Sequence, residues 1–220
     1  MPDYDPPENY SGTPNRFLLP AGTLLWHIHP QSRKPTEFTP YRRRPRTGDG
    51  RFDGTDEEPF DAYNAGLEAS TAVANVLLTG IPAPYSEFRT VRRVSVARQQ
   101  MSVVATAAEL SLVSLCDAID LSAVGQDLWL IHSDECHDPR VRRWARWIRA
   151  NAEWAEGFIW PPRDGPERRS VVLFGDRCDS AVMEPDPLYE VHLDDEFGAT
   201  WLNGVLVEYR ARIMPPKIKK

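Results

Sequence analysis

The chain has 220 residues, 41% of them hydrophobic and 26% charged, and 26 Lys and Arg against 32 Asp and Glu give a net charge of −6. This length and composition fit one globular domain that needs no disulfide or metal to bury a core, and the negative charge disfavours general binding of nucleic acids. No secretory signal opens the chain, no run of about 18 apolar residues could cross a bilayer, and the odd number of cysteines favours reduced thiols in a cytoplasmic protein.

The charges are unevenly distributed along the chain. Residues 31–51 contain seven basic side chains and two acidic ones, whereas residues 184–196 contain six acidic side chains and no Lys or Arg. Two interpretations stay open: solvated faces of opposite sign that balance each other, or an anion-binding site between Arg42 and Arg51.

The two ends of the chain differ in composition from its middle. Residues 1–20 are predicted to form a mobile Pro-rich leader, because the opening stretch "MPDYDPPENYSGTPN" shows no hydrophobic periodicity. The domain is expected to cover residues 21–213, followed by a basic tail at residues 214–220.

The first strand is predicted at residues 23–29, "TLLWHIH", and a polar loop over residues 31–59 follows it before a short strand at residues 60–66. Within the first strand, His27 and His29 alternate with apolar residues and therefore face the same side. That side is either a polar cleft or the solvated face of the sheet.

A helix of small residues is predicted next. In the stretch "STAVANVLL" (70–78), Asn75 stands among residues that are apolar nearly all round the helix. Ser70 or Thr71 is expected to cap the helix and Gly80 to end it. Because a helix of this kind is usually buried, Asn75 is either a satisfied polar group in a packed interior or a group that faces a cavity.

The second half of the chain mixes strands and helices. The clearest helix is at residues 139–157, with an apolar stripe toward the core and arginines over its remaining surface. Other elements are a short helix at 121–132, strands within 87–115 and at 157–160, 170–176 and 188–193, and a last helix at 196–213. This irregular order predicts an α+β fold, a single domain with a mixed sheet and flanking helices.

Sequence motifs limit the possible chemistry. No G-x-S-x-G, P-loop or G-x-G-x-x-G motif occurs. The cluster "HSDECHD" (132–138) matches no zinc spacing, so a solvent-exposed loop is favoured over a metal site and no metal is expected. In "GDGRFDG" (48–54), the glycines let the backbone approach a ligand closely, and the planar guanidinium of Arg51 suits a phosphate.

Several motifs, taken in order, resemble the RES domain family. They are "LWHIHP", "GRFDG", "YNA", "TAVANVLL", "VGQD", an Arg/Trp helix, "GFIW" and "VVLFGDRC", which lie between Leu24 and Tyr209. RES domains have an α+β fold similar to ADP-ribosyltransferases, and characterised members are toxins of toxin–antitoxin pairs that destroy NAD+. The resemblance therefore implies NAD+ as substrate or ligand, and a helix-turn-helix antitoxin-like protein as partner.

The family is named for an arginine, a glutamate and a serine, and all three are replaced in this chain. The resemblance puts His27 at the arginine of the first strand and Asn75 at the glutamate of the helix, with Glu68 as its substitute if the alignment shifts. The serine aligns with Val141 or Pro162, neither of which has a hydroxyl.

Arg51 and Tyr63 fall at positions that line the dinucleotide pocket in family members. The resemblance implies that Arg51 holds phosphate, that Tyr63 stacks on nicotinamide or ribose, and that His27 and Asn75 contact the ribose. The implied activity is cleavage of the nicotinamide–ribose bond, in which a carboxylate stabilises the positive charge that develops as nicotinamide leaves. Because Asn75 carries no charge, a catalytically inactive RES-fold binding or interaction module is the alternative.

Overall fold

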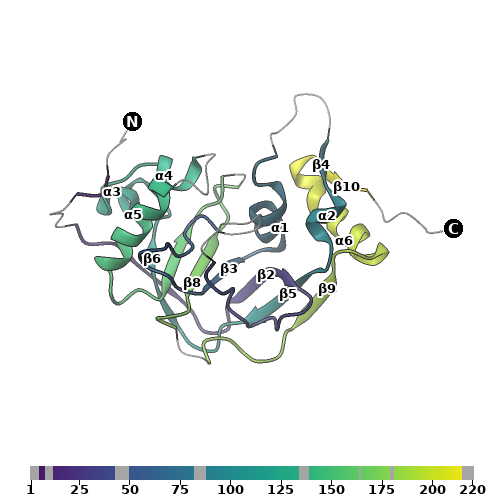
Figure 1. Cartoon of the computed structure of the whole chain (residues 1–220), viewed down its shortest axis with the longest axis horizontal. Helices are drawn as coiled ribbons and strands as arrows, with labels where there is room; N and C mark the ends of the chain where they lie inside the picture. The colour runs from purple at the N-terminus through teal and green to yellow at the C-terminus, as the bar shows by residue number, and fades with distance from the viewer. Residues whose placement is uncertain are drawn as a thin grey trace.

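The computed structural model describes residues 5–7, 12–42, 50–81, 88–133, 139–163, 165–178 and 181–214. Its centre is an eight-stranded mixed sheet in the order β1-β6-β7-β8-β3-β2-β5-β9 (Figure 1). Neighbouring strands run antiparallel, apart from the parallel pair β6 and β7. The strands are β1 (Arg16–Leu19), β2 (Leu24–Pro30), β3 (Ala62–Gly66), β5 (Gln99–Ala105), β6 (Leu110–Ser114), β7 (Gly157–Trp160), β8 (Ser170–Phe174) and β9 (Tyr189–His192).

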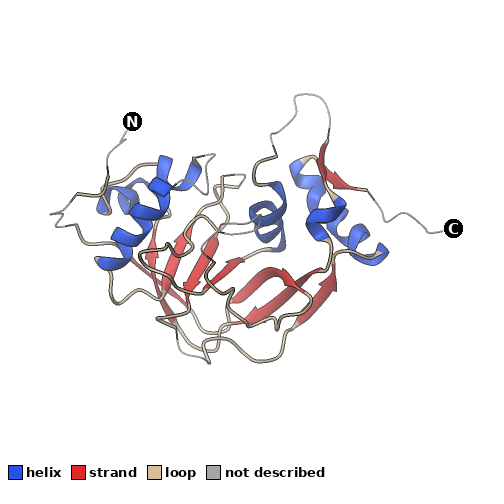
Figure 2. Cartoon of the chain, viewed as in Figure 1, coloured by secondary structure: helices blue, strands red, loops and turns tan. Residues whose placement is uncertain are grey.

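The described helices cover one face of this sheet in two groups (Figure 2). They are α1 (Ala69–Val73), which continues as the π-helix η1 (Ala74–Leu78), α2 (Arg93–Val96), α3 (Ala118–Ala123), α4 (Trp129–His132), α5 (Pro139–Ala150), α6 (Glu196–Leu206) and the 3₁₀-helix η2 (Val207–Tyr209). One apolar cluster joins α3, α4 and α5 to β6, β7 and β8, and a second joins α1, η1 and α6 to β2, β5 and β9. We call this side of the sheet the helix face.

The opposite side of the sheet is covered by loops and is called the loop face. Strand residues on this side pack against Phe38 from the segment after β2, and against Val182 and Met183 from the segment before β9. The central strands β3 and β8 are thus buried on both faces, and alternate residues of one strand contribute to different clusters. The prediction of an α+β fold with a mixed sheet and flanking helices is confirmed.

The helix that carries Asn75 differs from its prediction at its start, whereas its predicted end at Gly80 is confirmed. It starts at Ala69 with Glu68 as its N-cap and no side-chain cap bond, so neither Ser70 nor Thr71 caps it. Its second half widens into the π-helix, after which Gly80 adopts a positive φ of 75°. The first turn of α1 packs directly against the end of β3. A Cβ added to Gly66 would lie only 2.7 Å from the Ala72 nitrogen.

Three other predicted elements have different limits. Residues 88–97, expected to be strand-like, contain the short strand β4 (Arg89–Val91) and then α2. The helix predicted at 196–213 ends at Leu206, and the chain continues through η2 into β10 (Ala211–Ile213), which pairs in parallel with β4. The turn is made at Arg210, whose φ is 48°.

The ends of two further segments also differ from expectation. The long helix stops at Ala150 instead of Gly157, and Gly157 begins β7 instead. An added Cβ at Gly157 would lie 2.2 Å from the Val172 carbonyl oxygen, so this position of the strand suits a glycine. Residues Arg16–Leu19, inside the segment expected to be a leader, pair with β6. The sheet therefore begins before residue 21.

Candidate functional site

The residues expected to form one site lie on two faces of the sheet. Strand alternation places His27, His29 and Tyr63 with the loop-face cluster, and His27 lies against the Tyr63 ring at 4.3 Å between centroids. Asn75 belongs to η1 on the helix face and hydrogen-bonds Ser170, which pairs with Gly66 across β8 and β3. The structure therefore does not bring His27 and Tyr63 together with Asn75.

The two histidines of β2 face the same side, as the alternation predicted, but that side is a packed interior. Their rings stack 5.2 Å apart at an interplanar angle of 9°. His27 is 4% exposed and His29 is 1% exposed, so neither the polar cleft nor the solvated face describes their surroundings. Both rings are held by hydrogen bonds to backbone carbonyls, at 2.6 Å from His27 Nδ1 to Asn64 and at 3.0 Å from His29 Nδ1 to Pro30.

The hydrogen bond from His27 also links two strands. In the register of β2 with β3 only Trp26 and Gly66 are partners, so the strands separate beyond this pair within the described residues. The Nδ1–H of His27 donates to the Asn64 carbonyl just where the ladder ends. His27 thus stabilises the junction at the middle of the sheet, a structural role that its burial supports.

Burial holds both imidazoles neutral. Desolvation, with a smaller contribution from the neighbouring His29, lowers the pKa of His27 to about 3, and desolvation also lowers the pKa of His29. A neutral His27 with a proton on Nδ1 offers Nε2 as an acceptor, and Nε2 has no hydrogen-bond partner among the described residues.

Acid should therefore weaken the fold through His27. Between about pH 6.5 and its folded pKa of about 3, the unfolded state binds a proton that the folded state excludes, so the free energy of unfolding falls as the pH drops. The variant His27→Gln keeps a donor for the Asn64 carbonyl but does not titrate. We expect it to reduce the slope of the free energy of unfolding against pH by up to about 1.4 kcal/mol per pH unit. Urea unfolding of both proteins between pH 7 and pH 4.5 measures this, and parallel curves would contradict it.

His29 belongs to a polar network that runs toward the edge of the sheet. Its Nε2 accepts from the Ser102 hydroxyl at 2.8 Å, and the Ser102 oxygen accepts from Gln100 at 3.1 Å. Glu190 of β9 accepts from Gln100 and lies 3.3 Å from the Ser102 oxygen. The Ser–His pair resembles a nucleophile and its base, but Ser102 is fully buried, so a substrate has no access to its hydroxyl.

Tyr63 is fully buried in the loop-face cluster. Its hydroxyl donates to the Pro35 carbonyl at 3.0 Å, and desolvation raises the pKa of its phenol. Stacking on a nicotinamide or ribose, as the resemblance implies, would require this ring to be uncovered.

On the helix face, Asn75 is a satisfied polar group. Its Nδ2 donates to the Ser170 hydroxyl at 2.8 Å, and its side chain is half-buried. The family's serine aligns with Val141 or Pro162, neither of which has a hydroxyl. The structure brings a different hydroxyl, that of Ser170, to Asn75 from 95 positions away in the chain. Val141 lies in the apolar core around α5.

A second polar pair lies beside the first. Asn64 Nδ2 donates to Asp53 Oδ1 at 2.8 Å, and Asp53 Oδ2 accepts from the Gly50 backbone nitrogen at 2.7 Å. Asn64 and Gly66 are separated by two positions on β3, or about 7 Å, and share the helix face. We call Asp53, Asn64, Asn75 and Ser170 the polar strip, which lies between the two apolar clusters of the helix face.

Arg51 lies next to the strip but contacts the end of α4. Its guanidinium donates to the Leu130 carbonyl at 3.2 Å, to the Ser133 hydroxyl at 2.8 Å and to the Ser133 carbonyl. These bonds fix the turn at residues 50–54 to α4, so binding a phosphate would require Arg51 to exchange them. Its proposed neighbours Arg43, Arg44 and Arg46 are outside the described residues.

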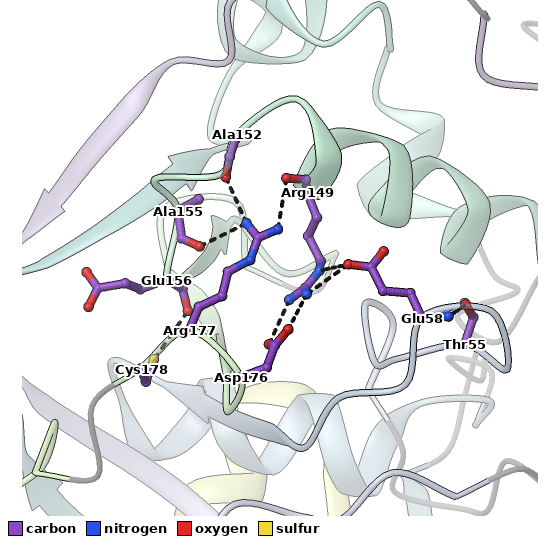
Figure 3. A network of polar contacts seen from close by, with 9 residues as sticks. All are labelled: Thr55, Glu58, Arg149, Ala152, Ala155, Glu156, Asp176, Arg177 and Cys178. Carbon is purple, nitrogen blue, oxygen red and sulfur yellow. Dashed lines mark hydrogen bonds and ion pairs between the residues drawn. The ribbon is translucent and has the colours of Figure 1, made fainter.

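The arginines of α5 also hold the segment that carries Asp53, although they were expected to cover an outer surface. Arg142 is buried and donates to the carbonyls of Gly50 and Gly54 at 3.3 and 3.4 Å. Arg149 is 1% exposed and pairs with Glu58 and Asp176 at 2.9 and 2.8 Å, while Arg177 donates to the carbonyls at the end of α5 (Figure 3).

Glu68, the other carboxylate considered for the helix, faces outward. It is exposed at the start of α1 and forms an ion pair with Arg168 at 3.3 Å. The cluster at 132–138 lies outside the described residues from Asp134 to Asp138. Within the described part of the chain, no group of three or more His, Cys, Asp and Glu side chains is arranged to hold a metal ion.

Comparison with known proteins agrees with this architecture. The RES domain model matches residues 24–196, most of the chain, so the protein belongs to the RES domain family. A chain of the crystal structure of the M. tuberculosis MbcT–MbcA toxin–antitoxin complex has a similar fold, with a TM-score of 0.52 and 13% identity over 79% of this chain and 85% of that chain. No curated protein sequence matches significantly. No helix in the described ranges is long and apolar enough to traverse a bilayer.

Proposed function

We propose that the protein is a toxin-like RES domain that binds NAD+ on the helix face, over the polar strip, and cleaves its nicotinamide–ribose bond slowly. The observation that carries the proposal is the position of Asn75, half-buried on η1 and hydrogen-bonded to Ser170 between the two helix groups. Family membership supports NAD+ as the ligand. Such a ligand and the absence of a long apolar helix in the described residues are consistent with a cytoplasmic protein.

The polar strip suits the ribose part of a nucleotide. The amides of Asn75 and Asn64 and the hydroxyl of Ser170 are donors and acceptors for sugar hydroxyls. An uncharged amide at position 75 stabilises the cation that develops at the ribose far less than a carboxylate does, so slow cleavage is expected. His27 and Tyr63, buried on the loop face, would support the strands from behind instead of contacting the ribose.

A partner is also part of the proposal. The structural likeness to a chain of a toxin–antitoxin complex supports a protein partner of the antitoxin type. A helix-turn-helix protein encoded next to this chain would agree with that assignment.

A second function is favoured by a separate observation. Arg51 is fully engaged at α4, and Tyr63 is covered, so two of the residues expected at a dinucleotide pocket already have protein partners. This arrangement is typical of a scaffold that has lost its ligand and serves as an interaction module without catalysis.

Calorimetric titration of the purified full chain with NAD+ separates the two functions. The proposal predicts saturable binding that Ser170→Ala weakens, because the variant removes the hydroxyl that positions Asn75. ATP is the control ligand: it has phosphates and adenine but no nicotinamide, so equal binding of ATP would show that the nicotinamide part is not recognised. The absence of heat with millimolar NAD+ would overturn the proposal in favour of the interaction module.

A further inference from the structure

We propose that Asp53 supplies the negative charge that Asn75 cannot, as the carboxylate that faces the reacting ribose. This inference rests on the proposed function, since it concerns the same NAD+ site. Asp53 was not among the expected site residues; it lies in the turn at residues 50–54, within "GRFDG". The contacts of this turn carry the argument.

The carboxylate of Asp53 is directed to the polar strip by two hydrogen bonds. Oδ2 accepts from the Gly50 nitrogen at 2.7 Å, a bond typical of an Asp that closes a local turn. Oδ1 accepts from Asn64 Nδ2 at 2.8 Å, which reaches across to the helix face of β3. The first bond closes the turn, whereas the second places the charge beside Asn64. Asn64 lies two positions, or about 7 Å, along β3 from Gly66, which pairs with the Asn75-bonded Ser170 of β8.

The turn approaches the Asn64 side chain of β3 closely at Gly50. A Cβ added to Gly50 would lie 2.4 Å from Asn64 Oδ1 and 2.7 Å from Asn64 Nδ2. Gly50 and Asn64 are therefore in contact, and Asp53 is held against the strand by the same contact.

The residues on both sides of Asp53 are anchored. Phe52 is fully buried, with its ring edge-on to Phe158 and Trp160 at 5.4 and 4.9 Å. Arg51 is bonded to the end of α4, as described above. Arg142 donates to the carbonyls at both ends of the turn.

Anchoring of this kind is what a preorganised charge needs. A carboxylate that is fixed before the reaction stabilises a developing cation without the cost of reorienting, so its contribution exceeds that of a mobile surface group. Packing of Phe52 in the core and hydrogen bonding by two arginines restrict the backbone of Asp53. Asp53 is therefore suited to this role, whereas Glu68 is exposed and paired with Arg168.

The reaction consumes NAD+ and water. The bond between ribose C1′ and the nicotinamide nitrogen breaks, and its electron pair returns to the ring, which leaves as neutral nicotinamide. The positive charge that develops at C1′ and the ring oxygen is stabilised by the Asp53 carboxylate. The oxygen of a water molecule bonds to C1′ and releases one proton to solvent, so the products are ADP-ribose, nicotinamide and a proton.

The test compares Asp53→Asn with the wild-type full chain. Nicotinamide release is followed by chromatography over hours, and NAD+ affinity is followed by calorimetry. We expect release to fall at least tenfold while the NAD+ dissociation constant stays within about threefold, since the loss of one well-aimed charge acts mainly on the transition state. Glu57→Gln is the matched control: it removes an exposed carboxylate of the same segment, paired with Arg146 at 3.7 Å, and should leave release unchanged.

Thermal unfolding of each variant guards against a folding effect. If Asp53→Asn does not fold, nicotinamide release by Asp53→Ser is measured instead, because serine removes the charge and keeps a polar side chain that is common in turns. Release at the wild-type rate by a folded Asp53 variant would overturn the role of Asp53 and leave the NAD+ proposal intact. Wild-type binding of NAD+ without any release would overturn both the role of Asp53 and the proposed cleavage, and would leave NAD+ binding alone. A wild type that neither binds nor cleaves NAD+ would overturn the whole proposed function.

Discussion

Replacing Asn75 by Glu is expected to raise the rate of nicotinamide release from NAD+ by about 10²-fold, because it places a carboxylate on η1 where the proposed ribose lies. The substitution suits the local structure. Asn75 is half-buried, and its amide donates to Ser170; a carboxylate would instead accept from the same hydroxyl at a similar distance. The rate is measured by chromatography with wild type and variant at equal concentration.

Asn75→Gln is the control for this prediction. It has the length of Glu but no charge, so it separates the effect of charge from that of side-chain size and should leave the slow rate unchanged. Equal gains for Glu and Gln would contradict the electrostatic explanation, and no gain for Glu with bound NAD+ would show that the ribose does not lie near η1.

Arg149→Ala is expected to lower the free energy of unfolding by about 3 kcal/mol. The guanidinium is 1% exposed and lies over the rings of Phe60 and Phe174, with its carbon 4.0 and 4.3 Å from their centroids. It also bonds Glu58 and Asp176, from the segment before β3 and the end of β8 (Figure 3). Its removal leaves two carboxylates unpaired and a cavity between two aromatic rings.

A neighbouring arginine of the same helix is the matched control. Arg146 pairs with Glu57 at 3.7 Å and has a side chain 45% exposed, so Arg146→Ala should change stability by less than about 1 kcal/mol. Urea unfolding at pH 7 measures both variants. A loss for Arg149→Ala no larger than that for Arg146→Ala would contradict the assigned structural role.

Elements with a strong local pattern were predictable from the sequence. Strict alternation defined β2, and the apolar stripe of residues 139–157 defined α5. The conformations of segments 88–97 and 196–213 were not predictable from the sequence, because their apolar residues fit a helix or a strand equally well. In the structure β4 and β10 pair with each other, and this tertiary contact decides the conformation of both.

The site was only partly predictable, for a similar reason. Alternation shows that His27 and His29 share a side, but which side the helices cover depends on the whole sheet. Asn75 was recognised as an unusual polar residue, yet its partner Ser170 is brought to it only by the register of β3 with β8. Arg51 was expected to bind a ligand, and its contacts with Ser133 depend on how α4 packs.

The position of Asp53 has a signal in the sequence, namely the glycines on either side of it. The glycines of "GRFDG" predict a close backbone approach, and in the structure Gly50 does approach Asn64. The residue thereby placed beside β3 is Asp53, two positions after the arginine that drew attention.

The most direct measurement is nicotinamide release from NAD+ by the purified wild-type chain, followed by chromatography over hours against an enzyme-free blank. The account predicts slow release above the blank that depends on Asp53 and increases in Asn75→Glu. Release no faster than the blank in both proteins, with no binding of NAD+ by calorimetry, would contradict it and leave a RES-fold interaction module.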